Sequence, residues 1–250
     1  TEDDELGKLI GSLQWKLGKD GFIHAEETAE RESSTEIVPG IRIDNGFGTS
    51  QLINNQEKQT LDVKQSKVIL TSYTMRDLRP LEKVIDQLVK AGVREITVIA
   101  RAWSEEGIKV CLENILKTNV KIYPLNAPYM DMQERFKDLE ALTGARFFDS
   151  ESSSLEDMQV SDVGYAEKIT AQRFHADIEG LNDEETRARV EKRAKEIEDK
   201  LKGSVSDFEK KNLSERIAQL RNGFGVIKVG SPSDMERRRL FDKAEDAVNS

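Results

Sequence analysis

The stretch from about residue 67 to residue 149 alternates between short apolar runs and amphipathic helical segments, and this alternation constrains the fold more than any other feature. The predicted order is strand 67–73, helix 77–90, strand 94–100, helix 104–117, strand 120–125, helix 133–142 and strand 145–149. Strands that alternate with helices in this way are typical of a parallel sheet with right-handed crossovers. The sequence therefore predicts an α/β body flanked by helices.

Helical segments lie outside this body at both ends of the chain. Leucine and isoleucine recur at helical spacing over residues 6–17, and a charged helix is predicted after residue 231. Two copies of Asn-Gly-Phe-Gly, at 45–48 and 222–225, bracket the body between them. Nothing around the two copies matches, so they do not mark a sequence repeat.

This arrangement predicts that the α/β body is inserted into a smaller α+β domain. The chain would cross into the body near Gly40 and return near Gly223, because glycine tolerates the positive φ values that a bending joint can require. The expected division is residues 1–38 and 223–250 for the smaller domain and 39–222 for the inserted one.

Two further segments belong to this expectation. The acidic, Ser/Thr-rich stretch 26–36 is interpreted as a linker or an exposed hairpin. After a Ser-rich patch we expect a long charged helical region that forms an antiparallel hairpin, broken at Gly203. Its apolar spacing rests on Val190, Ala194, Ile197, Leu201, Leu213, Ile217 and Leu220.

Charge and cysteine content exclude several classes of function. The chain has 38 Lys and Arg against 47 Asp and Glu, a formal charge of −9, which opposes nonspecific binding to nucleic acid or to an anionic membrane. No apolar run approaches the length that spans a bilayer. A single cysteine excludes an internal disulfide and fits a reducing compartment.

The motifs that carry catalysis or metal binding are absent from the sequence. Gly223-x-Gly225 leads into a strand, whereas a phosphate loop should open a helix. His24 and His175 have no partner at the spacing of a metal site, and Cys111 is expected to be a buried, inert thiol. We therefore expect no metal site and no complete enzyme.

The two predicted crossover helices carry wider apolar stripes than burial on a sheet requires. Their inner rows would pack on the sheet, while their outer edges would flank a shared groove. For any single one of these residues, burial in the core is the favoured interpretation. The functional hypothesis is that Ile85, Val89, Ile108 and Leu112 stay partly exposed and bind apolar segments of other proteins.

Several stretches occur in a fixed order and at consistent separation, among them GKLIGSLQWKLGKDGFI, PGIRIDNGF, LVKAG, NAPYMDMQERFKDLEALTG, DFEKKNLSERIAQLRNGFGVIKVGSPSDME and KAEDAVNS. Together they resemble the apical and intermediate domains of the bacterial-type chaperonins, the GroEL family. The distant overall match is typical of a divergent bacterial, organellar or phage-encoded member.

The resemblance implies a polypeptide-binding apical domain at 39–222 and an intermediate hinge domain formed by 1–38 and 223–250. Family members bind non-native polypeptides and a lid co-chaperonin between two apical helices and a nearby loop. The matching positions here are Phe47, Leu52, Ile85, Val89, Ile108 and Leu112. Gly40 and Gly223 match the two apical hinges.

This sequence departs from the family at neighbouring positions of the groove. Glu82 and Glu113 stand where the family has apolar residues, and Gln51 replaces an aromatic residue. A more acidic groove should favour basic apolar segments, which puts the lid co-chaperonin in question as a partner.

Asp246 matches the family's catalytic aspartate, and a carboxylate there can orient the water that attacks a γ-phosphate near Mg²⁺. The family's equatorial domain, which holds ATP and Mg²⁺, has no counterpart in the sequence. We therefore expect an excised fragment that has no cofactor and no ATPase activity by itself.

The resemblance thus predicts part of an ATP-driven folding chaperone, a ring of identical subunits located in the cytoplasm of a bacterium or phage-infected host, or in an organellar matrix. Neither nucleic acid nor membrane is an expected partner. Two alternatives remain open: a stand-alone, ATP-independent holdase or assembly adaptor, and a small-ligand α/β enzyme. The enzyme would need polar residues after Tyr73, Ala100 and Pro124, at the carboxyl ends of the strands.

Overall fold

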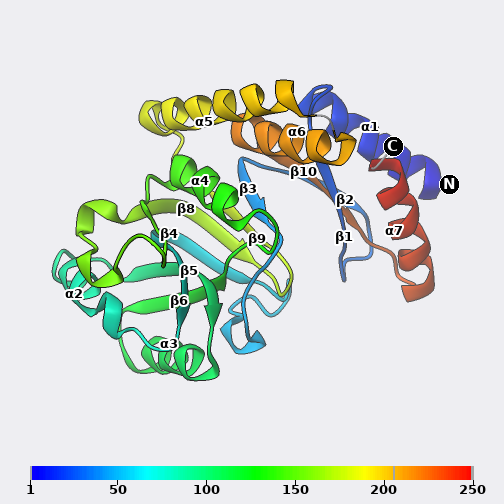
Figure 1. Ribbon diagram of the computed structural model, residues 1–250. Helices are drawn as coiled ribbons and strands as arrows, with labels where there is room; N and C mark the ends of the chain where they lie inside the picture. Colours follow the sequence, from blue (N-terminus) through cyan, green and yellow to red (C-terminus); the bar gives the residue numbers. More distant parts are fainter. Residues whose placement is uncertain (1, 205, 249–250) are drawn as a thin grey trace. The chain divides into compact units, whose positions relative to one another are not determined.

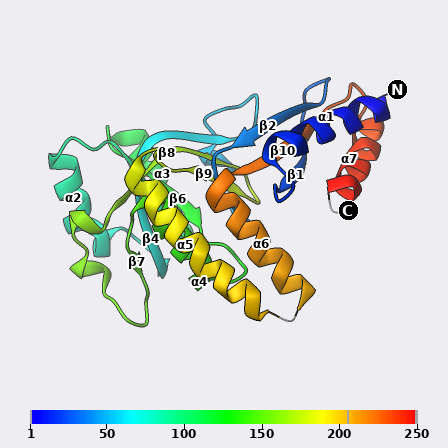
Figure 2. The same ribbon diagram turned by 90° about the horizontal axis from the view of Figure 1, so that it is seen from above.

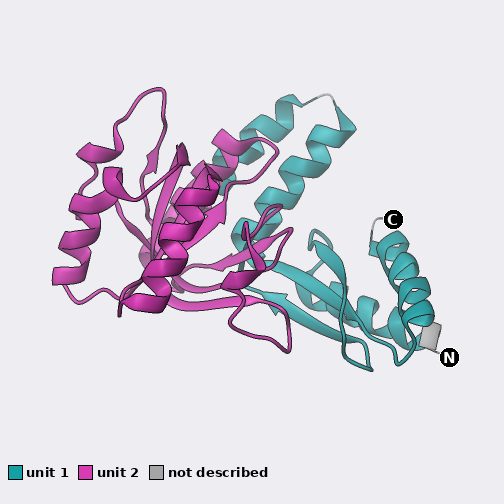
Figure 3. Ribbon diagram, turned by 90° about the horizontal axis from the view of Figure 1, so that it is seen from below, with its two compact units in different colours: residues 1–41, 194–250 teal, residues 42–193 magenta. Residues whose placement is uncertain are grey.

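The computed structural model describes residues 2–204 and 206–248, and the chain divides into two compact units (Figure 3). Unit 1 comprises residues 1–41 and 194–250, and unit 2 comprises residues 42–193. Unit 2 is one continuous segment, whereas unit 1 is built from both ends of the chain. The predicted insertion of an α/β body into a smaller discontinuous domain is therefore confirmed.

The compact units describe packing, and their boundaries fall after Ile41 and after Arg193. The second boundary lies inside a helix, well before Gly223. The functional domain boundaries expected at 38/39 and 222/223 stay a prediction.

The sheet centred on unit 2 has seven strands in the order β3-β9-β8-β4-β5-β6, with β7 also paired to β4 (Figure 1). The strands are β3 (Gly40–Ile43), β4 (Leu61–Met75), β5 (Glu95–Trp103), β6 (Lys121–Asn126), β7 (Phe147–Phe148), β8 (Gly164–Ala171) and β9 (Ala176–Glu179). β4, β5, β6 and β7 are parallel, as predicted, while β8 pairs antiparallel with β4 and β9. The sheet is therefore mixed.

The crossover helices connect the parallel strands where the sequence places them. The helix predicted at 104–117 is α3 (Glu105–Lys117), which Ser104 caps by accepting a hydrogen bond from the Gly107 N–H. The helix predicted at 77–90 starts late: a 3₁₀ turn, η2 (Arg79–Leu81), precedes α2 (Glu82–Lys90). Pro80 lies in this turn, which carries no side-chain cap, so the α-helix forms only after it.

Strands β8 and β9 lie where the sequence analysis expected a Ser-rich patch followed directly by helix, and that expectation is wrong. The inward positions of β8 are mostly small, so the apolar alternation typical of a strand is weak. They are Gly164, Ala166, Ile169 and Ala171. The segment forms a strand because it pairs with β4, and not because its own sequence strongly favours a strand.

The remaining helices agree with the predicted pattern. α4 (Met132–Thr143) ends at Gly144, whose φ of 70° is left-handed and which therefore closes the helix. The expected helical hairpin is α5 (Glu184–Gly203) followed by α6 (Asp207–Asn222), which lie side by side (Figure 2). Within unit 1 an ion pair of 2.5 Å joins Arg221 Nη1 on α6 to Glu198 Oε1 on α5.

Unit 1 folds around a three-stranded sheet in the order β1-β10-β2, formed by β1 (Ile23–Glu27), β10 (Phe224–Val229) and β2 (Ser34–Val38). The interpretation of 26–36 as a linker or exposed hairpin is wrong, because β10 lies between β1 and β2 and pairs with both. α1 (Glu2–Leu17) and α7 (Asp234–Val248) pack against this sheet. None of the helices in the described part of the chain combines the length and apolar character needed to cross a bilayer.

Candidate functional site

Helices α2 and α3 pack on the same face of the unit 2 sheet. Val84 and Leu88 of α2 and Cys111 of α3 belong to one buried cluster together with the sheet residues Val98 and Ile122. This is the geometry that two successive right-handed crossovers produce. The inner apolar rows of both helices are therefore buried in the core.

The row next to the buried one on each helix is partly exposed. Ile85 and Val89 on α2, and Ile108 and Leu112 on α3, are all intermediate in burial. Each follows a buried residue by one position, so it lies at the edge of the packed stripe. These four side chains can both contact the core and present apolar surface to a ligand.

Leu116 extends the row on α3: the sequence places it on the apolar stripe of this helix, but it is not among the predicted binding residues. It lies at i+4 from Leu112 and i+8 from Ile108, and its side chain is 82% exposed. The spacing was visible in the sequence, but nothing local separates an exposed from a buried leucine near the end of a helix. We call Ile85, Val89, Ile108, Leu112 and Leu116 the α2–α3 surface.

The loop after β3 lies against α3. A Cβ atom placed on Gly48 would come within 2.9 Å of Ile108 Cδ1, so the backbone at Gly48 and the Ile108 side chain are in contact. Phe47 pairs with Leu125 of β6 in an isolated antiparallel bridge. The structure thus brings the expected loop to the expected helix.

Phe47 and Leu52, both expected to bind polypeptide, are 5% exposed. Leu52 ends a short 3₁₀ turn, η1 (Ser50–Leu52), which Thr49 caps. In this conformation both side chains support the loop, and neither offers surface to a ligand. Their direct role in binding stays a prediction that requires the loop to move.

The two helices of the α2–α3 surface also carry acidic side chains. Glu82 and Glu113, the two departures noted in the sequence, are exposed. Glu113 is paired with Lys117 at 3.3 Å, and Asp86 with Lys90 at 2.6 Å. Exposed pairs of this kind are worth little energetically, so a basic ligand can displace the lysines.

The two predicted hinge glycines lie close together. Gly223 caps α6 with φ 71°, and a Cβ atom there would fall 2.0 Å from Val38 O. Gly40 is buried at the start of β3, two residues beyond Val38. Only glycine fits at position 223, but a hinge motion is a prediction that a single conformation does not test.

Asp246 lies on the last turns of α7 and is exposed, two residues after the buried Ala244. α7 is held by Leu240 and Ala244 in the core of unit 1. The helix therefore presents the Asp246 carboxylate to solvent on a packed element. Its catalytic role also stays a prediction.

The groups that the sequence analysis set aside behave as structural residues. Cys111 is fully buried, and burial raises the pKa of its thiol to about 12, which keeps it protonated and unreactive. His24 packs edge to face on Phe224 and lies 3.6 Å from Glu215 Oε1. Across residues 2–204 and 206–248, no three potential metal ligands cluster together.

The chain is similar in sequence to two curated proteins. The chain is 30% identical over 249 residues to the chaperonin GroEL of Aster yellows witches'-broom phytoplasma (strain AYWB). It is 29% identical over 249 residues to the chaperonin GroEL of Onion yellows phytoplasma (strain OY-M). Each match covers 98% of this chain and 46% of the relative, so the chain spans about half the length of the curated relatives it matches.

The fold is also similar to that of a solved chaperonin, gp146 of bacteriophage EL 2 (Pseudomonas aeruginosa), crystallised in the presence of ATP-BeFx. The TM-score is 0.68 at 16% identity, over 91% of this chain and 45% of that one. No family model matches the chain. Over 98% of its length the chain is therefore similar in sequence to about half of a GroEL chaperonin, and its fold is similar to that of a solved chaperonin.

Proposed function

We propose that this chain is the polypeptide-capturing part of a chaperonin, and that the α2–α3 surface binds apolar segments of non-native proteins. Residues 39–222 would act as the apical domain, and residues 1–38 and 223–250 as the intermediate domain. The observation that carries the proposal is the continuous apolar row on α3, which runs from the half-buried Ile108 to Leu116 at 82% exposure.

Exposing a row of apolar side chains to water costs free energy, which favours a binding role for this row. Apolar side chains at i, i+4 and i+8 form a strip along one edge of a helix, which is how helical surfaces contact apolar peptide segments. Ile85 and Val89 add a second, parallel source of apolar surface on α2. Weak, nondirectional burial of this type suits ligands that differ in sequence.

The acidic side chains at the edge of the surface define a preference among apolar segments. Glu82 and Glu113 would attract lysine or arginine placed beside the apolar residues of the ligand. Screening by salt should reduce this preference while leaving apolar binding in place.

The proposal extends to a whole protein of the relatives' length, about half of which this chain spans. We infer an ATP-driven ring of identical subunits, in which ATP and Mg²⁺ are held by the part of the relatives that this chain does not span. Asp246 would orient the attacking water there, and the joints at Gly40 and Gly223 would let the apical domain swing. The phage chaperonin was crystallised in the presence of ATP-BeFx, and this analogy supports nucleotide binding by the whole protein.

Ile108→Glu tests the capture site. Placing a carboxylate at the first position of the apolar row should weaken binding of a permanently unfolded, carboxymethylated protein by about tenfold or more, equivalent to about 1.4 kcal/mol. Fluorescence anisotropy of the labelled unfolded protein measures the dissociation constant.

The matched control is Val110→Glu on the same helix. Val110 is 39% exposed but lies off the Ile108–Leu116 row, so the same charge change there should leave affinity within about twofold. Equal losses for the two variants would show that charge alone, and not the row, controls binding, and the proposed site would be wrong.

A further inference from the structure

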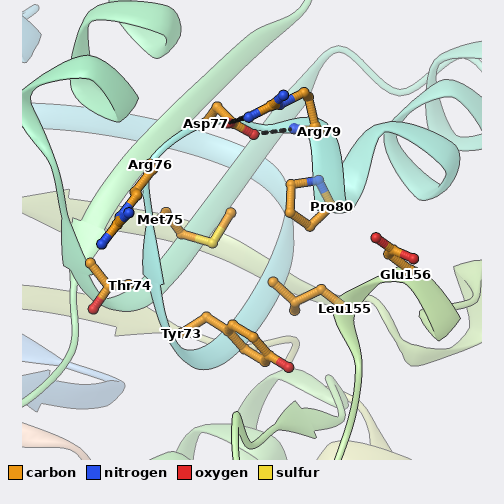
Figure 4. Close-up of a pocket in the computed structure, with 9 residues that line it drawn as sticks. All are labelled: Tyr73, Thr74, Met75, Arg76, Asp77, Arg79, Pro80, Leu155 and Glu156. Carbon is orange, nitrogen blue, oxygen red and sulfur yellow. Dashed lines mark hydrogen bonds and ion pairs between the residues drawn. The ribbon is translucent and has the colours of Figure 1, made fainter.

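A cavity of about 490 Å³ opens at the carboxyl end of β4, apart from the α2–α3 surface (Figure 4). Its walls come from the connection between β4 and α2, residues 73–80, and from Leu155 and Glu156 of the 3₁₀ turn η3 (Leu155–Asp157). None of the five residues of the α2–α3 surface lines it. Its volume is within the range of sites that enclose small molecules.

The floor of the cavity is apolar and fixed. Met75 and Leu155 are 1% and 3% exposed and belong to the core cluster, and Tyr73 packs against the same cluster. The Tyr73 hydroxyl donates a hydrogen bond to Ser153 O at 2.8 Å, which holds the ring in place and satisfies its polar end. Because Met75 and Leu155 are almost fully buried, the half-buried Tyr73 ring supplies most of the accessible apolar surface of this floor, and its hydroxyl already has a partner.

The rim carries charges that cancel. Arg76 and Arg79 are opposed by Asp77 and Glu156, two positive against two negative groups. Arg79 Nη2 lies 2.6 Å from Asp77 Oδ2, and the Arg79 N–H donates to Asp77 Oδ1 at 2.9 Å. Hydrogen bonds from Arg79 hold the pKa of the Asp77 carboxyl below its usual value, so the pair stays charged near neutral pH.

We propose that this cavity is a second ligand site, which takes one aromatic or large aliphatic side chain of an uncharged peptide segment. The apolar floor would receive the side chain, and the rim guanidinium and carboxylate groups would bond the C=O and N–H groups of its flanking amides. The rim carries no net charge, so a charged ligand of either sign would meet two groups of its own sign. It is therefore disfavoured relative to an uncharged ligand.

This inference rests on the proposed function in one respect, that the natural ligand is a polypeptide. The site also distinguishes the chain from the small-ligand enzyme considered above. Polar groups gather after Tyr73, as that alternative required, but the lining holds no residue from the ends of β5 or β6.

The test uses N-acetyl-phenylalaninamide as the probe, with N-acetyl-lysinamide and N-acetyl-aspartate amide as charged analogues. Amide chemical shifts of the 250-residue chain should change at residues 73–79 and 155–156 on titration with the neutral probe. Each charged analogue should bind at least about threefold more weakly. No shift changes there, or equal binding of all three probes, would overturn the proposal.

Two variants sharpen the result. Thr74 is exposed and lines the cavity, so Thr74→Trp should fill it and weaken the neutral probe about tenfold, whereas Ser12→Trp on α1 should not. Glu156→Lys changes the rim from balanced to two positive charges in excess, and the aspartate analogue should then bind best. Unchanged probe affinity in Thr74→Trp, or unchanged preference in Glu156→Lys, contradicts the site.

The outcomes separate the two proposals. If Ile108→Glu leaves capture of unfolded protein intact while the neutral probe still shifts residues 73–79, the proposed function fails and the cavity site stands. If Ile108→Glu abolishes capture while the probe gives no shifts at the cavity, the reverse holds.

Discussion

Replacing Asp138 with alanine is expected to lower the free energy of unfolding of unit 2 by about 3–5 kcal/mol. Asp138 on α4 and Arg193 on α5 are both almost fully buried, and Arg193 Nε donates to Asp138 Oδ1 at 2.8 Å. Removing the carboxylate leaves a buried guanidinium without its main counter-charge. Glu134 Oε2, 2.8 Å from Arg193 Nη2, remains and limits the loss.

Urea unfolding followed by tryptophan fluorescence measures this effect. Trp103 is half-buried in unit 2 and donates a hydrogen bond to Leu125 O, whereas Trp15 is 85% exposed, so the signal reports chiefly on unit 2. Asp86→Ala, which breaks the exposed pair with Lys90, is the control and should change stability little.

A double replacement separates a missing partner from a missing interaction. Asp138→Leu combined with Arg193→Met removes both buried charges and should recover much of the loss, because packed apolar groups can replace a buried pair. If the double variant is as unstable as Asp138→Ala, the loss comes from the missing Asp138–Arg193 interaction and not from a buried arginine that has lost its counter-charge.

Gly223→Ala is expected to destabilise unit 1 by about 2–5 kcal/mol. Two penalties add: the left-handed φ of 71° that a side chain disfavours, and a Cβ atom 2.0 Å from Val38 O and 2.9 Å from Pro39 Cα. Relief requires β2 and the start of β10 to separate, since Phe224 pairs with Val38.

Gly18→Ala is the matched control for this variant. Gly18 follows α1 with φ 84°, but no atom lies within 4 Å of its Cβ position, so only the conformational penalty of about 1–2 kcal/mol applies. Urea titrations followed by circular dichroism compare the two. Equal losses for Gly18→Ala and Gly223→Ala would mean that the contact with Val38 carries no cost and that β2 yields freely.

The parallel core of the fold was predictable because its signals are local. The apolar runs of β4, β5 and β6 and the glycine after α4 determine element type without reference to the rest of the chain. β8 and β2 are different. Most of their side chains are small or polar, and they form strands because they pair with β4 and β10, which the local sequence does not reveal.

Only the part of the candidate site that depends on local sequence was predictable. Helical spacing identified the outer rows of α2 and α3, whereas a loop beside these helices was expected only from the family resemblance, and the structure shows its contact with Ile108 at Gly48. The burial of Phe47 and Leu52 follows from a turn and a bridge to β6 that spacing does not encode. The cavity was out of reach, because Leu155 joins residues 73–80 only through tertiary packing.

The central claim, that the α2–α3 surface captures non-native chains, is tested most directly by isoleucine methyl NMR on the 250-residue protein. On addition of the carboxymethylated unfolded protein, the δ1 methyl signals of Ile85 and Ile108 should shift or broaden. Those of Ile178 and Ile227, which are fully buried in the cores of units 2 and 1, should not change. Binding that leaves Ile85 and Ile108 unperturbed while other methyl groups respond would contradict the account.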